Sequence, residues 1–185
     1  IKGVKICGVS DLKTLNFITR HSNPPNFIGF ITNYKKSKRY VTIETLKKLT
    51  DQKKYKTNFV SVLVEPEEEI LKSIKNFKFD YFQLYNVDPD RTKYIKKKYE
   101  KKIITALTVD EKKDVDRYIF YENISDIILF DGKGYEKSIS FEHRHLDDIS
   151  KNISVMIAGN ISINNIPIIK NLDYFIDISG SLEDR

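Results

Sequence analysis

The residue best suited to proton-transfer chemistry in this sequence is its single cysteine. Cys7 closes the apolar run VKIC and is followed at once by a glycine. A lone cysteine is most often a small buried hydrophobe, but a thiolate at the end of a strand is also a competent base. Lys5 lies two residues earlier and would share its face of a strand. Lys5 is therefore the cation that could lower the pKa of the thiol.

Two carboxyl groups occupy comparable positions. Asp131 ends the apolar run DIILFD, and Asp177 interrupts the apolar run YFIDIS. Asp131 could equally be a helix cap, but partial burial would raise its pKa above about 4 and make it an acid. Asp177 would be costly inside a strand unless it were paired or hydrated. A base and an acid in one site could move protons on a bound substrate.

Other polar and small residues stand within or just after apolar runs. Gln83 could be a satisfied core amide, whereas Arg39 offers a planar fork that suits a carboxylate. Two late turns contain only small and polar residues, which are Gly159, Asn160, Ser179, Gly180 and Ser181. These residues could be turn formers only, but backbone N–H groups in such turns also bind phosphate.

The histidines do not predict a metal site. His21 falls at the end of a helical pattern, where it suits the helix dipole. His143 and His145 are two apart on a predicted helix and therefore point in different directions. One cysteine allows neither an internal disulfide nor a thiolate zinc cluster. The sequence predicts no metal and no cofactor.

The elements that must position these residues alternate regularly. Strands are predicted at 4–9, 27–32, 57–65, 81–86, 102–109, 126–131, 154–159 and 174–179. Helices are predicted at 11–21, 42–53, 66–77, 88–100, 110–123, 140–152 and 162–171. Strict alternation indicates a parallel sheet covered by helices, and eight such units close into a (β/α)8 TIM barrel. A doubly wound open sheet is the alternative, but no G-x-G-x-x-G follows any predicted strand.

Helix starts carry the usual signals, with Ser10 or Asp11, Thr42 and Asp88 as caps and Pro66 at a first helical position. All 185 residues form one predicted domain. The sequence stops six residues after the last predicted strand, before an eighth helix, although typical barrels have about 250 residues. We therefore expect the natural chain to continue beyond Arg185, and a fusion to another enzyme of the same pathway stays open.

The composition is that of an ordinary globular protein, with 40% hydrophobic residues. The net charge of +6 and the pI of about 9.1 allow nucleic-acid binding. Solvated lysines on helix faces, as in YIKKKYEKK at 94–102, explain the charge better. No run approaches the roughly 20 apolar residues of a membrane span, and no signal peptide opens the sequence. We expect a cytoplasmic protein that binds neither nucleic acid nor membrane, with a monomer favoured over an oligomer.

Several stretches resemble the phosphoribosylanthranilate isomerase family. VKICGV resembles the family's opening strand, which ends in K-I-C-G, and residues 27–42 resemble its G-F-x-F-x-x-x-S-x-R-Y-V stretch. ILFD at 128–131 is similar to the strand that ends in the family's essential aspartate. FQLYN at 82–86 resembles Q-L-H-G, IAGNISINNI at 157–166 resembles L-A-G-G-L-x-x-x-N-V, and FIDISGSLE at 175–183 resembles V-D-V-S-S-G-V-E. The matches are collinear and span nearly the whole sequence.

The resemblance implies a cofactor-free Amadori rearrangement in L-tryptophan biosynthesis. The substrate would be N-(5-phosphoribosyl)anthranilate and the product 1-(2-carboxyphenylamino)-1-deoxyribulose 5-phosphate. By the family's pattern Cys7 would be the general base and Asp131 the general acid, while Arg39 would hold the anthranilate carboxylate. Asp177 would contact the substrate near its amine and sugar, and Lys5 and Gln83 would also bind the substrate. The turns that contain Gly159, Asn160, Ser179, Gly180 and Ser181 would bind the phosphate.

The sequence departs from the family pattern in its loops. Tyr85 stands where Q-L-H-G has its histidine, and the glycine-rich loop after the sixth strand is replaced by GYEKSIS at 134–140, which could form a lid. Asn160 replaces a glycine, and the last turn reads Ser-Gly-Ser.

Two other interpretations of the function stay open. One is a different phosphate-binding barrel, such as an indole-pathway synthase or a sugar-phosphate epimerase. The other is an inactive barrel that serves as a binding module.

Overall fold

The computed structural model describes residues 1–132, 146, 148–162 and 164–182. Within them, parallel strands pair in chain order and β8 pairs with β1, so the sheet closes into a barrel. The strands are β1 (Gly3–Cys7), β2 (Phe27–Ile31), β3 (Asn58–Val64), β4 (Tyr81–Tyr85), β5 (Lys102–Val109), β6 (Ile127–Gly132), β7 (Val155–Ile157) and β8 (Phe175–Ile178). All eight predicted strands are confirmed, and so is the TIM-barrel fold.

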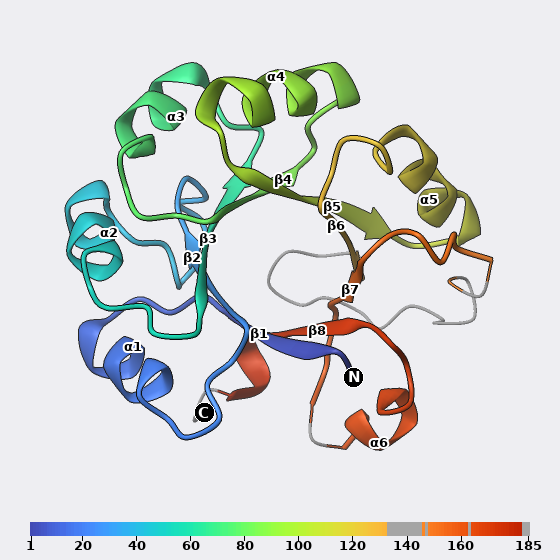
Figure 1. Ribbon diagram of the computed structural model, residues 1–185, viewed down its shortest axis with the longest axis horizontal. Coiled ribbons are helices and arrows are strands. Elements are labelled where there is room, and N and C mark those ends of the chain that lie inside the picture. The colour runs from blue at the N-terminus through green and yellow to red at the C-terminus, as the bar shows by residue number, and fades with distance from the viewer. Residues whose placement is uncertain (133–145, 147, 163, 183–185) are drawn as a thin grey trace.

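Helices surround the outside of the barrel (Figure 1). The α-helices are α1 (Leu12–Thr19), α2 (Ile43–Thr50), α3 (Glu68–Ile74), α4 (Pro89–Tyr99), α5 (Lys112–Asp116) and α6 (Ile166–Ile169). The 3-10 helices include η1 (Arg117–Phe120) and η3 (Gly180–Leu182). The helix predicted at 110–123 is thus divided between α5 and η1, and the one predicted at 162–171 is only four residues long. Of the helix predicted at 140–152, residues 140–145 and 147 lie outside the described residues, and residues 148–152 form turns and a bend in place of a helix.

Side-chain caps fix where the main helices begin. Asp11 accepts a hydrogen bond from the Thr14 N–H at 2.8 Å and caps α1. Thr42 caps α2 and Asp88 caps α4 in the same way, as predicted. Pro66 is not the first residue of α3, because that helix begins at Glu68 with Glu67 in the capping position.

Alternating side chains build two kinds of core. Residues that point outward from the strands pack under the helices in two clusters, one under α1 to α4 and one under the later helices. Residues that point inward form a separate cluster inside the barrel. At the first residues of their strands, Phe27 contacts Tyr81 and Phe175 edge-on, with ring centroids 5.4 and 5.2 Å apart. These aromatic rings close the N-terminal end of the barrel, so polar inward residues gather toward the other end.

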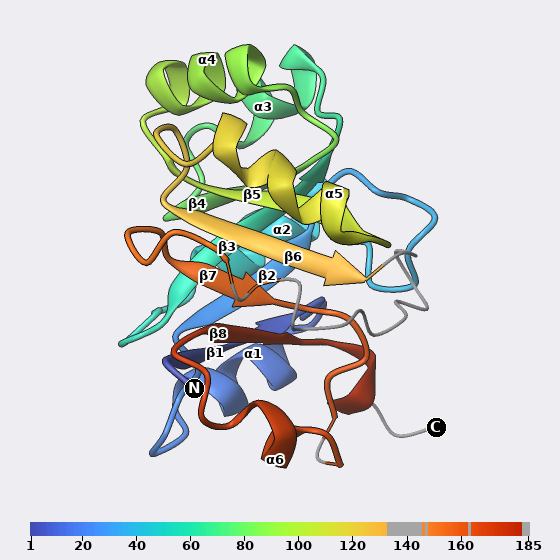
Figure 2. The same cartoon turned by 90° about the vertical axis from the view of Figure 1, so that its right-hand side faces the viewer.

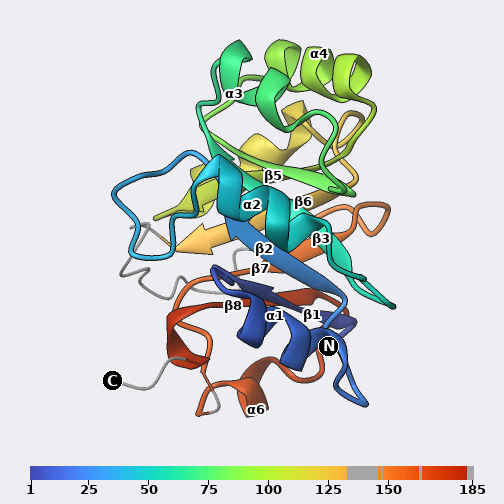
Figure 3. The ribbon, with the colours of Figure 1, turned by 90° about the vertical axis from the view of Figure 1, so that its left-hand side faces the viewer.

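The loops that follow the strands lie together at that other end. In Figures 2 and 3 the arrowhead of β6, the loop after β2 and the red 3-10 helix η3 all lie on the same side. That loop contains Arg39, and it is anchored by the Val41 N–H, which donates to the Ile31 carbonyl at 3.1 Å. The arrangement brings residues far apart in the sequence to one rim, which is where enzymes of this fold place their active sites.

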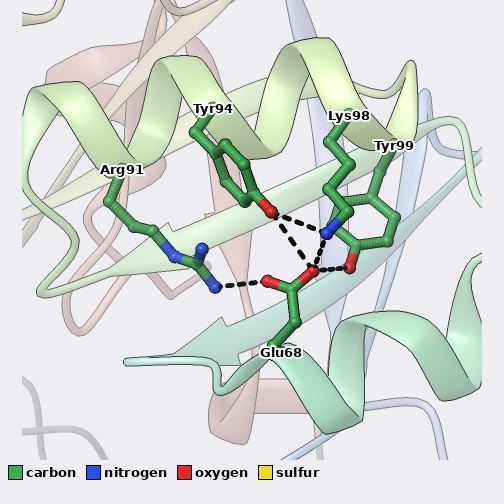
Figure 4. A network of polar contacts seen from close by, with 5 residues as sticks. All are labelled: Glu68, Arg91, Tyr94, Lys98 and Tyr99. Atoms are coloured by element: carbon green, nitrogen blue, oxygen red, sulfur yellow. Dashed lines mark hydrogen bonds and ion pairs between the residues drawn. The ribbon is translucent and has the colours of Figure 1, made fainter.

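A polar network on the outer surface ties α3 to α4 (Figure 4). The Glu68 carboxylate accepts from Arg91 Nη2 at 2.9 Å and from the Tyr99 hydroxyl at 2.6 Å, and it also pairs with Lys98. Hydrogen bonds from these donors hold the pKa of Glu68 down at about 2. Within the described residues no helix is long and apolar enough to cross a membrane.

Candidate active site

A buried ion pair lies at the centre of the site. Lys5 on β1 and Asp177 on β8 are register partners in adjacent strands. The Lys5 ammonium donates to Asp177 Oδ2 at 2.7 Å, and Lys5 is fully buried. Burial alone would lower the pKa of Lys5, but Asp177 and Cys7 outweigh burial and raise it. Burial raises the pKa of Asp177, while Lys5 opposes that rise. The cost that the sequence predicts for a carboxyl group in this strand is therefore offset by a lysine partner.

Cys7 stands beside this pair at the end of β1. Its Sγ and the Lys5 Nζ both approach Gly29 of β2, where an added Cβ would lie 3.0 Å from Sγ and 3.2 Å from Nζ. Gly29 therefore leaves the room that the thiol and the ammonium occupy side by side. Cys7 packs against the inward cluster of the barrel. The sequence-based expectation that Lys5 and Cys7 share one face is confirmed.

The thiol itself holds its proton tightly. Burial is the largest influence and raises the pKa of Cys7 to about 11, with the charge of Asp177 adding to the rise. Lys5 lowers the pKa, as expected, but does not outweigh burial. The expected influence of Lys5 is thus confirmed in direction, but the pKa of Cys7 stays above its ordinary value, because burial disfavours the thiolate more than one ammonium stabilises it.

Asp131 near the end of β6 receives a hydrogen bond from β4. The Tyr85 hydroxyl donates to Asp131 Oδ2 at 2.9 Å, and Gln83 Nε2 donates to the Tyr85 oxygen at 3.3 Å. Gln83 is fully buried and Tyr85 is 7% exposed. Gln83 and Tyr85 are two residues apart and therefore project from the same face of the strand. These two side chains of β4 form a chain of donors that ends on the carboxyl group of β6.

The environment of Asp131 makes it an acid close to neutral pH. Burial raises its pKa to about 7, the hydrogen bond from Tyr85 opposes the rise, and the charges of Asp177 and Lys5 act in opposite directions. The expectation of a raised pKa is confirmed. Asp131 also raises the pKa of Cys7 through its charge, so the two groups interact across the barrel interior.

Three buried oxygens in this cluster have no hydrogen-bond partner in the described structure: Gln83 Oε1, Asp131 Oδ1 and Asp177 Oδ1. A buried acceptor without a donor is costly. Three such acceptors inside one barrel suit a ligand that offers several O–H or N–H groups. The described residues contain no group of three or more His, Cys, Asp or Glu side chains placed to hold a metal ion.

Arg39 reaches across the rim between two glycines. A Cβ added at Gly8 would lie 2.2 Å from Arg39 Cδ, and one added at Gly180 would lie 2.9 Å from Arg39 Nη2. Gly8 also adopts a φ of +90°, which side-chain-bearing residues rarely adopt. The aliphatic part of the Arg39 side chain therefore occupies the space that a side chain at Gly8 would fill. Its guanidinium group lies beside Gly180 at the start of η3.

The two turns predicted to bind phosphate lie next to each other. The Ser181 hydroxyl, in η3 after β8, donates to the Ile161 carbonyl after β7 at 2.7 Å. Gly159 and Asn160 both have positive φ, and the Asn160 carbonyl accepts from Asn165 Nδ2 at 2.7 Å. Ser179 and Gly180 are exposed beside them. The turns thus form one continuous stretch of rim. The loop at 134–140, His143 and His145 lie outside the described residues.

Reasoning from the sequence overlooked Tyr85 and Gly8 as parts of the site. Tyr85 was detectable, because strand alternation places it on the face of Gln83. The close approach of Arg39 to Gly8 could not be detected, because no local sequence pattern relates Gly8 to a loop more than 30 residues away.

The fold and the site together define a class of protein. A closed eight-stranded barrel carries, inside its C-terminal end, a thiol, an ion pair and a carboxyl group that titrates near pH 7. Such a set suits a barrel enzyme that moves protons on a polar substrate.

Comparisons with known proteins identify the family. Residues 4–185 match the family model described as N-(5'phosphoribosyl)anthranilate (PRA) isomerase. An N-(5'-phosphoribosyl)anthranilate isomerase of Rhizobium etli is 31% identical over 97% of this chain and 85% of its own length. One from Brucella canis is 29% identical over the same shares. The chain belongs to the N-(5'-phosphoribosyl)anthranilate isomerase family.

Solved structures agree on the fold. The crystal structure of phosphoribosyl anthranilate isomerase from Thermotoga maritima has a TM-score of 0.86 and 23% identity, covering 100% of this chain and 91% of that chain. A phosphoribosyl anthranilate isomerase in complex with reduced 1-(o-carboxyphenylamino)-1-deoxyribulose 5-phosphate has a TM-score of 0.83 and 21% identity, covering 100% and 90%.

Proposed function

We propose that this protein converts N-(5-phosphoribosyl)anthranilate into 1-(2-carboxyphenylamino)-1-deoxyribulose 5-phosphate, a step of L-tryptophan biosynthesis. The observation that carries the proposal is that Asp131 and Cys7 lie close enough for the charge of Asp131 to raise the pKa of Cys7, in a chain that belongs to this isomerase family. The reaction is an isomerisation, so it requires protons to be moved but no net oxidant or reductant. The protein would act in the cytoplasm on a small phosphorylated molecule.

Asp131 acts as the general acid in this proposal. It donates a proton to the ribose ring oxygen, the C1–O bond breaks, and the ring opens to an iminium formed by the anthranilate nitrogen. Its pKa of about 7 keeps a large protonated fraction at neutral pH. Oδ1, the oxygen that lacks a partner among described residues, is the one available to carry the transferable proton.

Cys7 acts as the general base. It removes the proton from C2 of the opened sugar, which gives a neutral enolamine. Protonation at C1 and loss of the proton from the C2 hydroxyl group then produce the amino-ketose. The thiolate forms only transiently, because the pKa of Cys7 is about 11. Lys5 stabilises the thiolate when it forms, and Asp177 keeps Lys5 in place. Asp177 Oδ1 accepts from the amine or a hydroxyl of the substrate.

The rim residues hold the two ends of the substrate. Arg39 binds the anthranilate carboxylate with its planar guanidinium. The turns at Gly159–Asn160 and Ser179–Ser181 bind the phosphate through backbone N–H groups, since they contain no lysine or arginine. Gln83 contributes its free Oε1 to the sugar hydroxyls.

A fluorescence assay that follows the loss of the anthranilate signal tests the proposed function. Wild-type protein should consume N-(5-phosphoribosyl)anthranilate and form the ketose without added metal or cofactor. The matched control is the same incubation with Cys7→Ser. Absence of turnover by folded wild-type protein would overturn the proposal, and would favour a different phosphate-binding barrel or a barrel that only binds.

A further inference from the structure

We infer that Tyr85 is a positioning residue that holds the carboxyl group of Asp131 through its Oδ2 atom and so reserves Oδ1 for proton transfer. This inference rests on the proposed function, in which Asp131 is the general acid. It assigns a task to a residue at which the chain departs from the family pattern. The departure therefore changes how the acid is held, while the acid itself is kept.

The direction of the hydrogen bonds supports this assignment. Gln83 Nε2 donates to the Tyr85 oxygen at 3.3 Å, so the single hydroxyl hydrogen of Tyr85 is left to point at Asp131. The pKa of Tyr85 is raised well above 10, first by burial and then by the charge of Asp131, so the hydroxyl stays protonated wherever the enzyme works. Tyr85 is thus a permanent donor to Oδ2.

A donor on Oδ2 also determines where the acidic proton of Asp131 resides. An oxygen that already accepts a hydrogen bond from Tyr85 is the poorer place for that proton, so Oδ1 carries it. Oδ1 is buried and has no partner in the described part of the chain. The groups whose charges reach Asp131 are Lys5, Cys7 and Asp177, on β1 and β8, and Tyr85 is its hydrogen-bonding partner from β4.

The test compares Tyr85→Phe with Tyr81→Phe. Both variants remove one hydroxyl from the inward face of β4, but Tyr81 lies at the opposite end of the strand against Phe27. The readout is the titration of the Asp131 carboxyl, followed by 13C NMR of labelled aspartate and assigned with Asp131→Asn. Because Tyr85 lowers the pKa of Asp131, Tyr85→Phe should raise its midpoint by about one pH unit. Tyr81→Phe should leave it in place.

Turnover at pH 6 supplies the second readout. There Asp131 is mostly protonated in wild type and in Tyr85→Phe, so a lower rate measures lost orientation and not a changed charge. We expect kcat to fall about tenfold in Tyr85→Phe and to be unchanged in Tyr81→Phe. An Asp131 midpoint in Tyr85→Phe equal to that of wild type would overturn the inference. The NMR titration needs no turnover, so an inactive wild-type protein would count against the proposed function alone.

Discussion

At the scale of single residues, the chemistry depends on whether Cys7 or Asp131 holds the proton. At neutral pH the thiol keeps its proton and the carboxyl group is about half ionised, because their pKa values are about 11 and about 7. The acting pair, thiolate with carboxylic acid, carries the same net charge as the commoner pair, thiol with carboxylate. With pKa values about 4 apart, the acting pair is roughly 10⁴-fold rarer.

This ordering of the pKa values predicts the pH profile of kcat/KM. Below about pH 7, Asp131 stays protonated and the rate rises with pH as the thiolate fraction of Cys7 grows. Above about pH 7, loss of the acid cancels further gain of the base, so kcat/KM should level off until Cys7 ionises. The fluorescence assay at constant ionic strength measures the profile. A steady fall above pH 7 would mean that Cys7 ionises before Asp131.

Substrate binding should depend on how Arg39 is held. Arg39→Ala removes the guanidinium and should raise KM about 10- to 100-fold with a smaller effect on kcat. Gly180→Ala should raise KM by about threefold to tenfold, because its Cβ would lie 2.9 Å from Arg39 Nη2 and displace it. Arg39→Lys is the matched control, since it keeps the positive charge but lacks the planar guanidinium group with its paired N–H donors. Substrate titrations that give a wild-type KM for Arg39→Ala would refute this role.

At the scale of elements, sequence patterns predicted the strands better than the helices. Both faces of a barrel strand are covered, so short continuous apolar runs such as FIGFI and YFQLY locate the strands. Helices were predicted too long in two places, because α5 gives way to the 3-10 helix η1 after Asp116 and α6 has only four residues. The position of Arg39 between Gly8 and Gly180 depends on contacts between distant loops, which no local sequence pattern predicts.

The surface network between α3 and α4 should contribute modestly to stability. Its members are partly exposed, so solvent screens their attraction. Glu68→Gln should lower Tm by a few degrees, and the difference from wild type should shrink in high salt. The lowered pKa of Glu68 means that its contribution is present above about pH 4.5 and is lost as pH falls toward about 2. Thermal denaturation at pH 7 and at pH 2 checks this, with the solvent-facing Glu69→Gln as control.

At the scale of the whole molecule, the Lys5–Asp177 pair links the first strand to the last and lies where the barrel closes. Lys5→Met would leave Asp177 buried without its cation and should cost about 3–5 kcal/mol in the free energy of unfolding. The double variant Lys5→Met/Asp177→Leu should recover much of that loss, because no charge is then buried. Urea denaturation of both variants measures the difference. Equal losses in the single and double variants would show that packing, and not the unpaired charge, sets the cost.

The barrel also explains which parts of the site could be foreseen. Parallel strands direct their carboxyl ends to one rim, so a list of strand-end residues was enough to gather Cys7, Asp131 and Asp177. The direction in which the pKa of Cys7 shifts could not be foreseen, because it depends on how far the thiol is removed from water once the barrel closes. The positions of the strands and of their end residues can be predicted from the sequence. The pKa shifts cannot, because they depend on burial and on charges that come together only in the folded barrel.

The measurement that tests the account most directly is kcat for Cys7→Ser and Asp131→Asn with N-(5-phosphoribosyl)anthranilate, beside Ser73→Ala on the exposed face of α3 as a control. Both site variants should fold like wild type by circular dichroism and lose turnover by about 10²- to 10⁴-fold, while Ser73→Ala keeps wild-type activity. Near-normal turnover by either site variant would contradict the assignment of the thiol and the carboxyl group as base and acid.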